Sequence, residues 1–170
     1  MRCFIGIPVT GMLADQCVTL SHSMGRATPV ANLHLTLAFL GEQSEAALRG
    51  LHDSLADLAG GHSSFQQRLN HCEPFPVAQG PFMALTGVAS PALLQLHRDL
   101  CLRLQAQGLP QEDRPFRPHI TLAKPGPAQA PFKAIGEWVL PVDALWLYRS
   151  ELGEPFPTYE PLARFPLSFG

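Results

Sequence analysis

The chain contains 170 residues, which is enough for one domain or for two small lobes with a shared core. Its apolar fraction of 46% is usual for a globular protein, and its net charge of −2 gives no general attraction for long nucleic acids. No apolar run approaches a membrane span and no signal-peptide core is present, so we expect a cytoplasmic protein that does not contact membranes. We expect four scattered cysteines to be reduced packing residues: Cys3, Cys17, Cys72 and Cys101.

The first half of the chain alternates between strand and helix patterns. An apolar run that ends at Pro8 predicts the first strand, and Gly25 breaks the weakly patterned helix that follows it. Leucines at helical spacing after Ser44 predict a better defined helix. The expected elements are a strand over 2–9, a helix over about 11–24, a strand over 33–40, a helix from Ser44 to Gly60 and a strand over 63–72.

The second half continues in the same way. Ser90 and Pro91 predict a helix start, because serine caps the first turn and proline fits the first helical position. Gly108 is the expected end of this helix. Loops are expected around Pro74, Pro76 and Gly80-Pro81. The expected elements are a strand over 82–88, a helix over 91–107, a strand over 119–124, and strands near 135–140, 143–150 and 160–167.

One short pattern occurs twice, 85 positions apart. The letters HLTLA begin at His34, and HITLA begins at His119. Because side chains two residues apart in a strand share a face, each histidine lies beside the threonine that follows it, Thr36 or Thr121. The aliphatic residues take the opposite face. Each strand therefore presents an imidazole and a hydroxyl on one side and buries the other.

The same order of elements surrounds both motifs. A strand, a helix and a motif strand are expected over residues 3–40 and again over residues 82–124. A repeat of this kind, related by a pseudo-twofold axis, would place the two motif strands around one cleft. The alternation also allows a parallel doubly wound sheet. We rank that arrangement second, because no glycine-rich phosphate loop follows the first strand.

Two imidazoles suit in-line displacement at phosphorus. With usual pKa values near 6.5, one can be a neutral base that activates the attacking oxygen while the other is a protonated acid for the leaving oxygen. The hydroxyls and a nearby cation can hold the non-bridging oxygens. We favour this metal-free chemistry over a zinc site, which needs three protein ligands, and over a serine nucleophile, because no G-x-S-x-G elbow occurs. The other histidines are interpreted as ordinary core or surface residues: His22, His52, His62, His71 and His97.

These features resemble the two-histidine (2H) phosphoesterase superfamily, and in detail the bacterial RNA 2′,3′-cyclic phosphodiesterases, also called 2′-5′ RNA ligases. Four segments carry the resemblance and span nearly the whole chain. They are RCFIGI from Arg2, NLHLTLAFLG from Asn32, RPFRPHITL from Arg114, and LYRS from Leu147 followed by YEPL from Tyr159.

The resemblance implies an α+β fold in which residues 1–170 form a single domain of two pseudo-symmetric lobes. Each lobe is a mainly antiparallel sheet with outer helices, and the motifs face each other across a central cleft. The implied activity is hydrolysis of an RNA-terminal 2′,3′-cyclic phosphate to a 2′-phosphate without a cofactor. A weak reverse reaction that joins tRNA halves through a 2′-5′ bond is also implied. A monomer is expected, because the duplication supplies both half-sites.

By analogy, His34 is the proton donor to the leaving 3′-oxygen and His119 is the proton acceptor that activates water. The symmetry of the motifs leaves the reverse assignment open. Thr36 and Thr121 carry over as phosphate-binding hydroxyls, and Lys124 as a substrate-binding cation. The partners implied are RNA ends or nucleotides that carry a 2′,3′-cyclic phosphate.

Two positions differ from, or complicate, the family pattern. Lys124 stands where the family often has arginine, so the charge is kept but the planar stacking surface is lost. Strict alternation puts Lys124 on the face opposite His119, so it reaches the site only if the strand ends there. The same alternation predicts that Phe39 is a core residue. Phe116 and Tyr148 remain alternatives for stacking on a terminal base.

Two other functions stay open at this point. A similar cleft could hold a nucleotide or an RNA end without turnover, although binding alone does not need both histidines. The same chemistry could also act on a small cyclic nucleotide or an ADP-ribose cyclic phosphate, with which the low basic charge is compatible.

Overall fold

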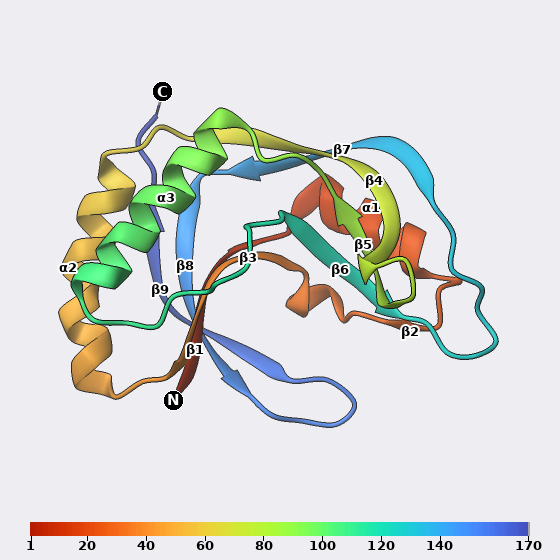
Figure 1. The fold of residues 1–170 in the computed structure, drawn as a ribbon, viewed down its shortest axis with the longest axis horizontal. Helices are drawn as coiled ribbons and strands as arrows, with labels where there is room; N and C mark the ends of the chain where they lie inside the picture. The colour runs from red at the N-terminus through yellow and green to blue at the C-terminus, as the bar shows by residue number, and fades with distance from the viewer. Residues whose placement is uncertain (170) are drawn as a thin grey trace.

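The computed structural model describes residues 1–169 and contains nine strands, three α-helices and one 3₁₀ turn (Figure 1). The predicted elements are confirmed, with shifts at their ends. In chain order they are β1 (Arg2–Pro8), α1 (Gly11–Ser21), β2 (Arg26–Ala27), the turn η1 (Val30–Asn32), β3 (His34–Glu42), α2 (Glu45–Gly60), β4 (Phe65–Val77), β5 (Gly80–Thr86), α3 (Pro91–Ala106), β6 (His119–Lys124), β7 (Ala134–Val142), β8 (Ala144–Glu151) and β9 (Thr158–Pro166).

The strands form two sheets. The first has the order β3-β1-β8-β9 and the second has the order β2-β6-β5-β4-β7. All pairings between these named strands are antiparallel, so the parallel doubly wound alternative is wrong. The two motif strands occupy related places, because β3 pairs with β1 just as β6 pairs with β5. The expected α+β fold with two similar antiparallel lobes is confirmed.

The helices cross between the sheets. α1 follows β1 of the first sheet but packs against β6 and β7 of the second. α3 follows β5 of the second sheet but lies beside α2, which packs on β9 of the first (Figure 1). One hydrophobic cluster joins buried side chains of both sheets and all three helices. Each lobe is therefore completed by a helix from the other half of the repeat, which fixes the sheets relative to each other.

Serine residues begin the two longer helices, as the sequence predicts. The Ser44 hydroxyl accepts a hydrogen bond from the Ala47 amide, and the Ser90 hydroxyl accepts one from the Leu93 amide, each at 3.1 Å. The stripe that each helix buries is made of leucines: Leu48, Leu51, Leu55 and Leu58 in α2, and Leu93, Leu96, Leu100 and Leu104 in α3. α1 ends three residues earlier than predicted, and the two-residue strand β2 is too short for its pattern to be visible in the sequence.

The loop predicted around Pro74 and Pro76 is wrong, because β4 continues through both residues. The pairing of β4 with β7 runs only from Phe65 to Cys72, whereas its pairing with β5 continues to Val77. Beyond Cys72 the strand is open on one side. A proline there sacrifices no hydrogen bond to a neighbouring strand, so the missing N–H is tolerated.

A β-bulge in β3 overturns the prediction that Phe39 is a core residue. Ile5 of β1 lies opposite Ala38, but the next residue of β1 lies opposite Thr36, so Leu37 is an extra residue. An extra residue reverses the facing of every residue after it. Phe39 consequently turns to the side of Thr36 and is 53% exposed.

The same bulge occurs in β6. Met83 of β5 lies opposite Ala123 while its neighbour lies opposite Thr121, which leaves Leu122 as the extra residue. Leu122 and Ala123 are both buried, and Lys124 is exposed. The strict alternation that put Lys124 on the face opposite His119 is therefore wrong, and the register returns Lys124 to the face of Thr121.

The four cysteines are free, and all except Cys101 are buried, as predicted. Burial raises the pKa of Cys17 to about 12 and that of Cys72 to about 11. Since the thiolate is the reactive form, these side chains act as packing residues. None of the helices in residues 1–169 is long and apolar enough to cross a membrane.

Gln67 gives a test of how the second sheet holds α3. Its side chain is 1% exposed; it donates to the carbonyls of Arg68 and Val88 at 2.7 and 2.9 Å and accepts from the Ser90 amide at 2.9 Å. We predict that Gln67→Leu lowers the free energy of unfolding in urea by about 2–3 kcal/mol, because three backbone groups lose their partner. The exposed neighbour provides the control: Gln66→Leu should change it by less than about 0.5 kcal/mol. Equal losses in both variants would contradict this account.

Candidate active site

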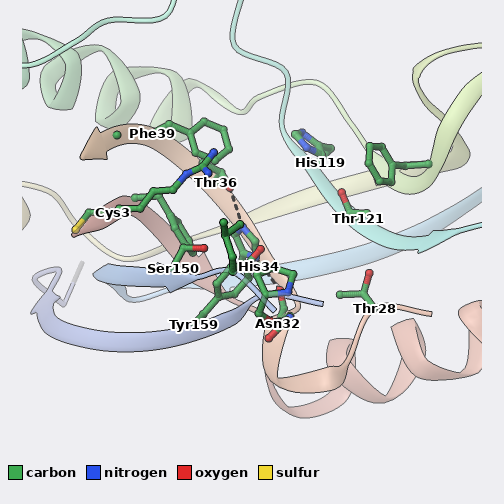
Figure 2. Close-up of a pocket in the computed structure, with 16 residues that line it drawn as sticks. Cys3, Thr28, Asn32, His34, Thr36, Phe39, His119, Thr121, Ser150 and Tyr159 are labelled. Carbon is green, nitrogen blue, oxygen red and sulfur yellow. Dashed lines mark hydrogen bonds between the residues drawn. The ribbon is translucent and has the colours of Figure 1, made fainter. Parts of the chain in front are cut away.

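One cavity of about 530 Å³ is lined by residues of both sheets, and both motifs reach it. Figure 2 shows His34 and Thr36 from β3 on one side, and His119 and Thr121 from β6 facing them from the other. The four polar residues that the repeat singles out therefore lie together. The bulges do not disturb them, because each bulge comes after the threonine of its motif.

Two hydrogen bonds fix the His34 ring. Nδ1 lies 2.7 Å from the Asn32 carbonyl oxygen, and Nε2 lies 2.8 Å from the Thr36 hydroxyl. A carbonyl only accepts, so Nδ1 carries a proton and Nε2 of the neutral ring accepts from Thr36. The Asn32 side chain in turn donates to the Pro157 carbonyl at 2.9 Å, which ties the turn before β3 to the segment before β9.

Packing also constrains His34. Its ring lies 4.9 Å from the ring of Phe4 and 5.3 Å from that of Tyr159, which meets it edge-on. Gly6, which is opposite Thr36, leaves the necessary room on β1. A Cβ atom there would lie 3.0 Å from the Leu35 carbonyl oxygen and 3.5 Å from the His34 ring. The Leu35 carbonyl therefore disfavours a side chain at this position, whereas the contact with the His34 ring would be an ordinary one.

His119 is held by an equivalent bond. Its Nδ1 lies 2.9 Å from the Arg117 carbonyl oxygen, again two residues earlier in the chain. Phe75 stacks on the imidazole with the ring centroids 4.0 Å apart, and the Arg117 guanidinium lies over the Phe75 ring, 4.6 Å from its centroid. Within residues 1–169 no hydrogen bond involves Nε2 of His119. That nitrogen presents an unshared lone pair when the imidazole is neutral.

Burial lowers the pKa of both catalytic candidates below the usual 6.5. For His34, the carbonyl of Asn32 partly offsets this effect, and the nearby His119 lowers the pKa further. For His119, the carbonyl of Arg117 raises the pKa and the Arg117 guanidinium lowers it. Both rings are therefore mainly neutral at pH 7 in the free protein, and an anion bound between them would favour protonation.

Lys124 stands apart from the other predicted site residues. The four motif residues line the cavity, but Lys124 does not form part of its wall. It lies opposite Arg26 of β2, on the same face of the sheet as Thr121. Both cations are exposed and neither belongs to a salt bridge formed within residues 1–169. Neither residue is among those that line the cavity.

The aromatic residues are distributed differently from the sequence-based expectation. Phe116 stacks on His97 at 3.9 Å, and Tyr148 is 9% exposed and stacks on Phe4 at 5.0 Å, so both serve packing. Phe39 and Phe82 instead line the cavity. The repeat contains a signal for Phe82, because it occupies in β5 the place that Phe4 occupies in β1.

Several other residues of the site carry no signal in the sequence. Asn32 acts through its backbone carbonyl, which a residue-type pattern does not reveal. Arg2 of β1 and Ser150 of β8, which lie opposite each other in the first sheet, also line the cavity. Among residues 1–169, no group of three or more His, Cys, Asp or Glu side chains is arranged to hold a metal ion. The polar groups that line the cavity include two imidazoles with hydroxyls beside them and the guanidinium of Arg2.

Comparison with known proteins agrees with this arrangement. The profile of the 2′-5′ RNA ligase superfamily matches residues 19–154. A Thermus thermophilus relative named RNA 2′,3′-cyclic phosphodiesterase is 34% identical over 84% of this chain and 75% of the relative. An Escherichia coli relative of the same name is 32% identical over 98% of this chain and 97% of the relative. A third, from Geobacillus stearothermophilus, is 30% identical, but the chain spans only 56% of its length.

Solved structures give the same result. A crystal structure of a Thermus thermophilus protein superposes with a TM-score of 0.87 at 28% identity, with 99% of each chain covered. Escherichia coli LigT complexed with 3′-AMP superposes with a TM-score of 0.77 at 30% identity, over 98% of this chain and 97% of LigT. The fold, the paired motifs and the profile match together show that this chain belongs to the 2′-5′ RNA ligase superfamily.

Proposed function

We propose that the protein hydrolyses RNA-terminal 2′,3′-cyclic phosphates to 2′-phosphomonoesters by acid–base catalysis with two histidines. The observation that carries this proposal is the convergence of His34 and His119, from equivalent strands of two sheets, on one cavity. Each ring is held by a hydrogen bond from Nδ1, so Nε2 is the nitrogen that can exchange a proton with the substrate. Relatives from four species carry the name RNA 2′,3′-cyclic phosphodiesterase, and LigT has been crystallised with 3′-AMP and with phosphate.

His119 is the proton acceptor in this mechanism. Its Nε2 lone pair takes a proton from water as the water oxygen forms a bond to phosphorus. The Arg117 carbonyl stabilises the imidazolium that results, because it accepts from Nδ1–H. The absence of a protein partner for Nε2 within residues 1–169 supports this choice over the reverse assignment.

His34 is the proton donor. As the bond between phosphorus and the 3′-oxygen breaks, Nε2–H passes its proton to that oxygen, which leaves a 3′-hydroxyl and a 2′-phosphate. In the free protein Nε2 contacts the Thr36 hydroxyl. Substrate that takes over this nitrogen releases Thr36 to donate to a non-bridging oxygen. Proton exchange with solvent then returns both histidines to their starting states.

Thr121 and Lys124 complete the phosphate site in our proposal. The Thr121 hydroxyl faces the cavity beside His119 and can donate to a non-bridging oxygen. Lys124 follows the bulge on the same face and contributes positive charge from the edge of the cleft. The two histidines and two hydroxyls supply what the reaction needs, so the mechanism uses no metal.

Ligation follows from the same geometry. If the 5′-hydroxyl of a second RNA replaces water, its attack on the cyclic phosphate forms a 2′-5′ bond, and ring opening supplies the free energy. We propose that this weak activity can join tRNA halves. We also propose that residues 1–170 act as a single domain and as a monomer, because one chain supplies both half-sites. The free cysteines support a cytoplasmic location.

The two histidines give the most direct mutational test. With an oligoribonucleotide that ends in a 2′,3′-cyclic phosphate, we predict that His34→Ala and His119→Ala each lower kcat about 10²–10⁴-fold. The double variant should be little worse than either, because the two groups act in one step. His71→Ala is the control, since His71 is exposed on β4 and bonds only its neighbour Asn70. Circular dichroism should be unchanged in all variants.

The outcome also separates the competing functions. Wild-type activity in either single variant would contradict the mechanism. A wild-type protein that binds the RNA end without turnover would identify a binding module. Absence of both binding and turnover would direct attention to small cyclic phosphates.

The pH dependence tests the electrostatics of the site. Turnover requires one protonated and one neutral histidine: the acid is lost as pH rises through its pKa, and the base is lost as pH falls through its pKa. Both pKa values are lowered from 6.5, so we predict a bell-shaped profile of kcat/KM with its maximum below pH 6.5. The maximum of kcat should lie at higher pH, because bound phosphate favours the imidazolium. An alkaline limb of kcat/KM with a midpoint above about pH 7 would contradict the prediction.

A further inference from the structure

The cavity continues well beyond the two histidines, along β1. Gly6 lies opposite Thr36, Phe4 lies opposite Phe39, and Arg2 lies at the end of the strand. These alternate positions share one face, and Arg2 is about 13 Å along the strand from Gly6. Ser150 of β8 is the partner of Arg2. Figure 2 shows Ser150 at the end of the cavity away from Thr28 and His119.

Arg2 has the only permanently charged side chain among the described residues that line this cavity, and no carboxylate lines it. Within residues 1–169 Arg2 forms none of the salt bridges. Glu42, which lies opposite it on β3, is instead 3.2 Å from the amino group of Met1. Arg2 is exposed, and a guanidinium in a cavity wall without a carboxylate partner is available to an anionic ligand.

Arg2 begins β1, four residues before Gly6, so its guanidinium is attached to the end of the strand away from the two histidines. The rings of Phe4 and Phe39, whose centroids are 6.4 Å apart, also line the cavity. Phe4 is 4% exposed, so Phe39, at 53%, supplies most of this apolar surface. A ligand that fills the whole cavity therefore has an anion at each end and a less polar body between them. A nucleotide with a cyclic phosphate on one side and a phosphodiester on its 5′ side has this form.

We propose that Arg2 and Ser150 form a subsite for the phosphodiester on the 5′ side of the terminal nucleotide. The guanidinium can donate two hydrogen bonds to the non-bridging oxygens, and the Ser150 hydroxyl, which lines the same end of the cavity, can donate a third. This inference rests on the proposed function and specifies its substrate class. RNA strands are preferred to nucleoside cyclic phosphates because only they carry the second anion.

The test compares three substrates: adenosine 2′,3′-cyclic phosphate with a 5′-hydroxyl, the same compound with a 5′-phosphate, and the dinucleotide ApA that ends in a cyclic phosphate. For the wild type we expect kcat/KM to be about tenfold higher for the two substrates with the second anion. One hydrogen bond to a charged group strengthens binding by about this factor. In Arg2→Gln the ratio should fall to about one. Arg68→Gln removes an exposed arginine that pairs with Glu137 outside the cavity, and it should keep the wild-type ratio.

Salt dependence provides a second readout. For the dinucleotide, the slope of log kcat/KM against log salt concentration should become less negative by about 0.7 in Arg2→Gln, as expected for one lost contact to single-stranded phosphate. Arg68→Gln should leave the slope unchanged. Thermal unfolding checks that both variants are folded.

The results separate this inference from the function on which it rests. A wild-type ratio near one, or a tenfold ratio that persists in Arg2→Gln, would overturn the Arg2 subsite while the hydrolase stands. Failure of the wild type to hydrolyse any of the three substrates would overturn the proposed function itself. A ratio and a salt slope that both fall only in Arg2→Gln would establish the subsite.

Discussion

The hydrogen bond from each imidazole Nδ1 to the carbonyl two residues earlier is the constraint on which the site depends. It is made by His34 with Asn32 and by His119 with Arg117. Because a carbonyl can only accept, the bond sets the tautomer and leaves Nε2 of each ring to face the cavity. The two rings could not line one cavity unless the two sheets were held in a fixed position relative to each other. The crossed helices provide that restraint, because each sheet is covered by a helix that originates beside the other.

The two halves share one backbone arrangement, which we call the frame. The frame is the strand pair with a bulge directly after the threonine, which occurs at Leu37 and at Leu122. It brings the residue two positions after the bulge back to the cleft face in both halves. That residue is Phe39 in one half, where it lines the cavity, and Lys124 in the other half, where it lies outside the cavity wall. The same backbone arrangement therefore presents different side chains in the two halves.

The sequence allowed the central part of the site to be predicted, because strand alternation and an internal repeat act over a few residues. His34, Thr36 and their counterparts follow from this period alone. The position of Phe39 could not be predicted, because a bulge depends on the register between two strands and not on local pattern. Sequence reasoning likewise missed that β4 continues through its prolines, since tolerance there depends on which side of the strand is open. The role of Asn32 could not be predicted from residue type, because its backbone carbonyl performs it.

The central claim is that two histidines alone open a cyclic phosphate at its 3′-oxygen. The measurement that tests it most directly is incubation of the purified protein, in EDTA, with a short oligoribonucleotide that ends in a 2′,3′-cyclic phosphate. Enzymatic mapping of the product then shows which oxygen keeps the phosphate. The account predicts a 2′-phosphate at a rate that chelator does not change. A 3′-phosphate, or turnover that EDTA abolishes, would contradict it.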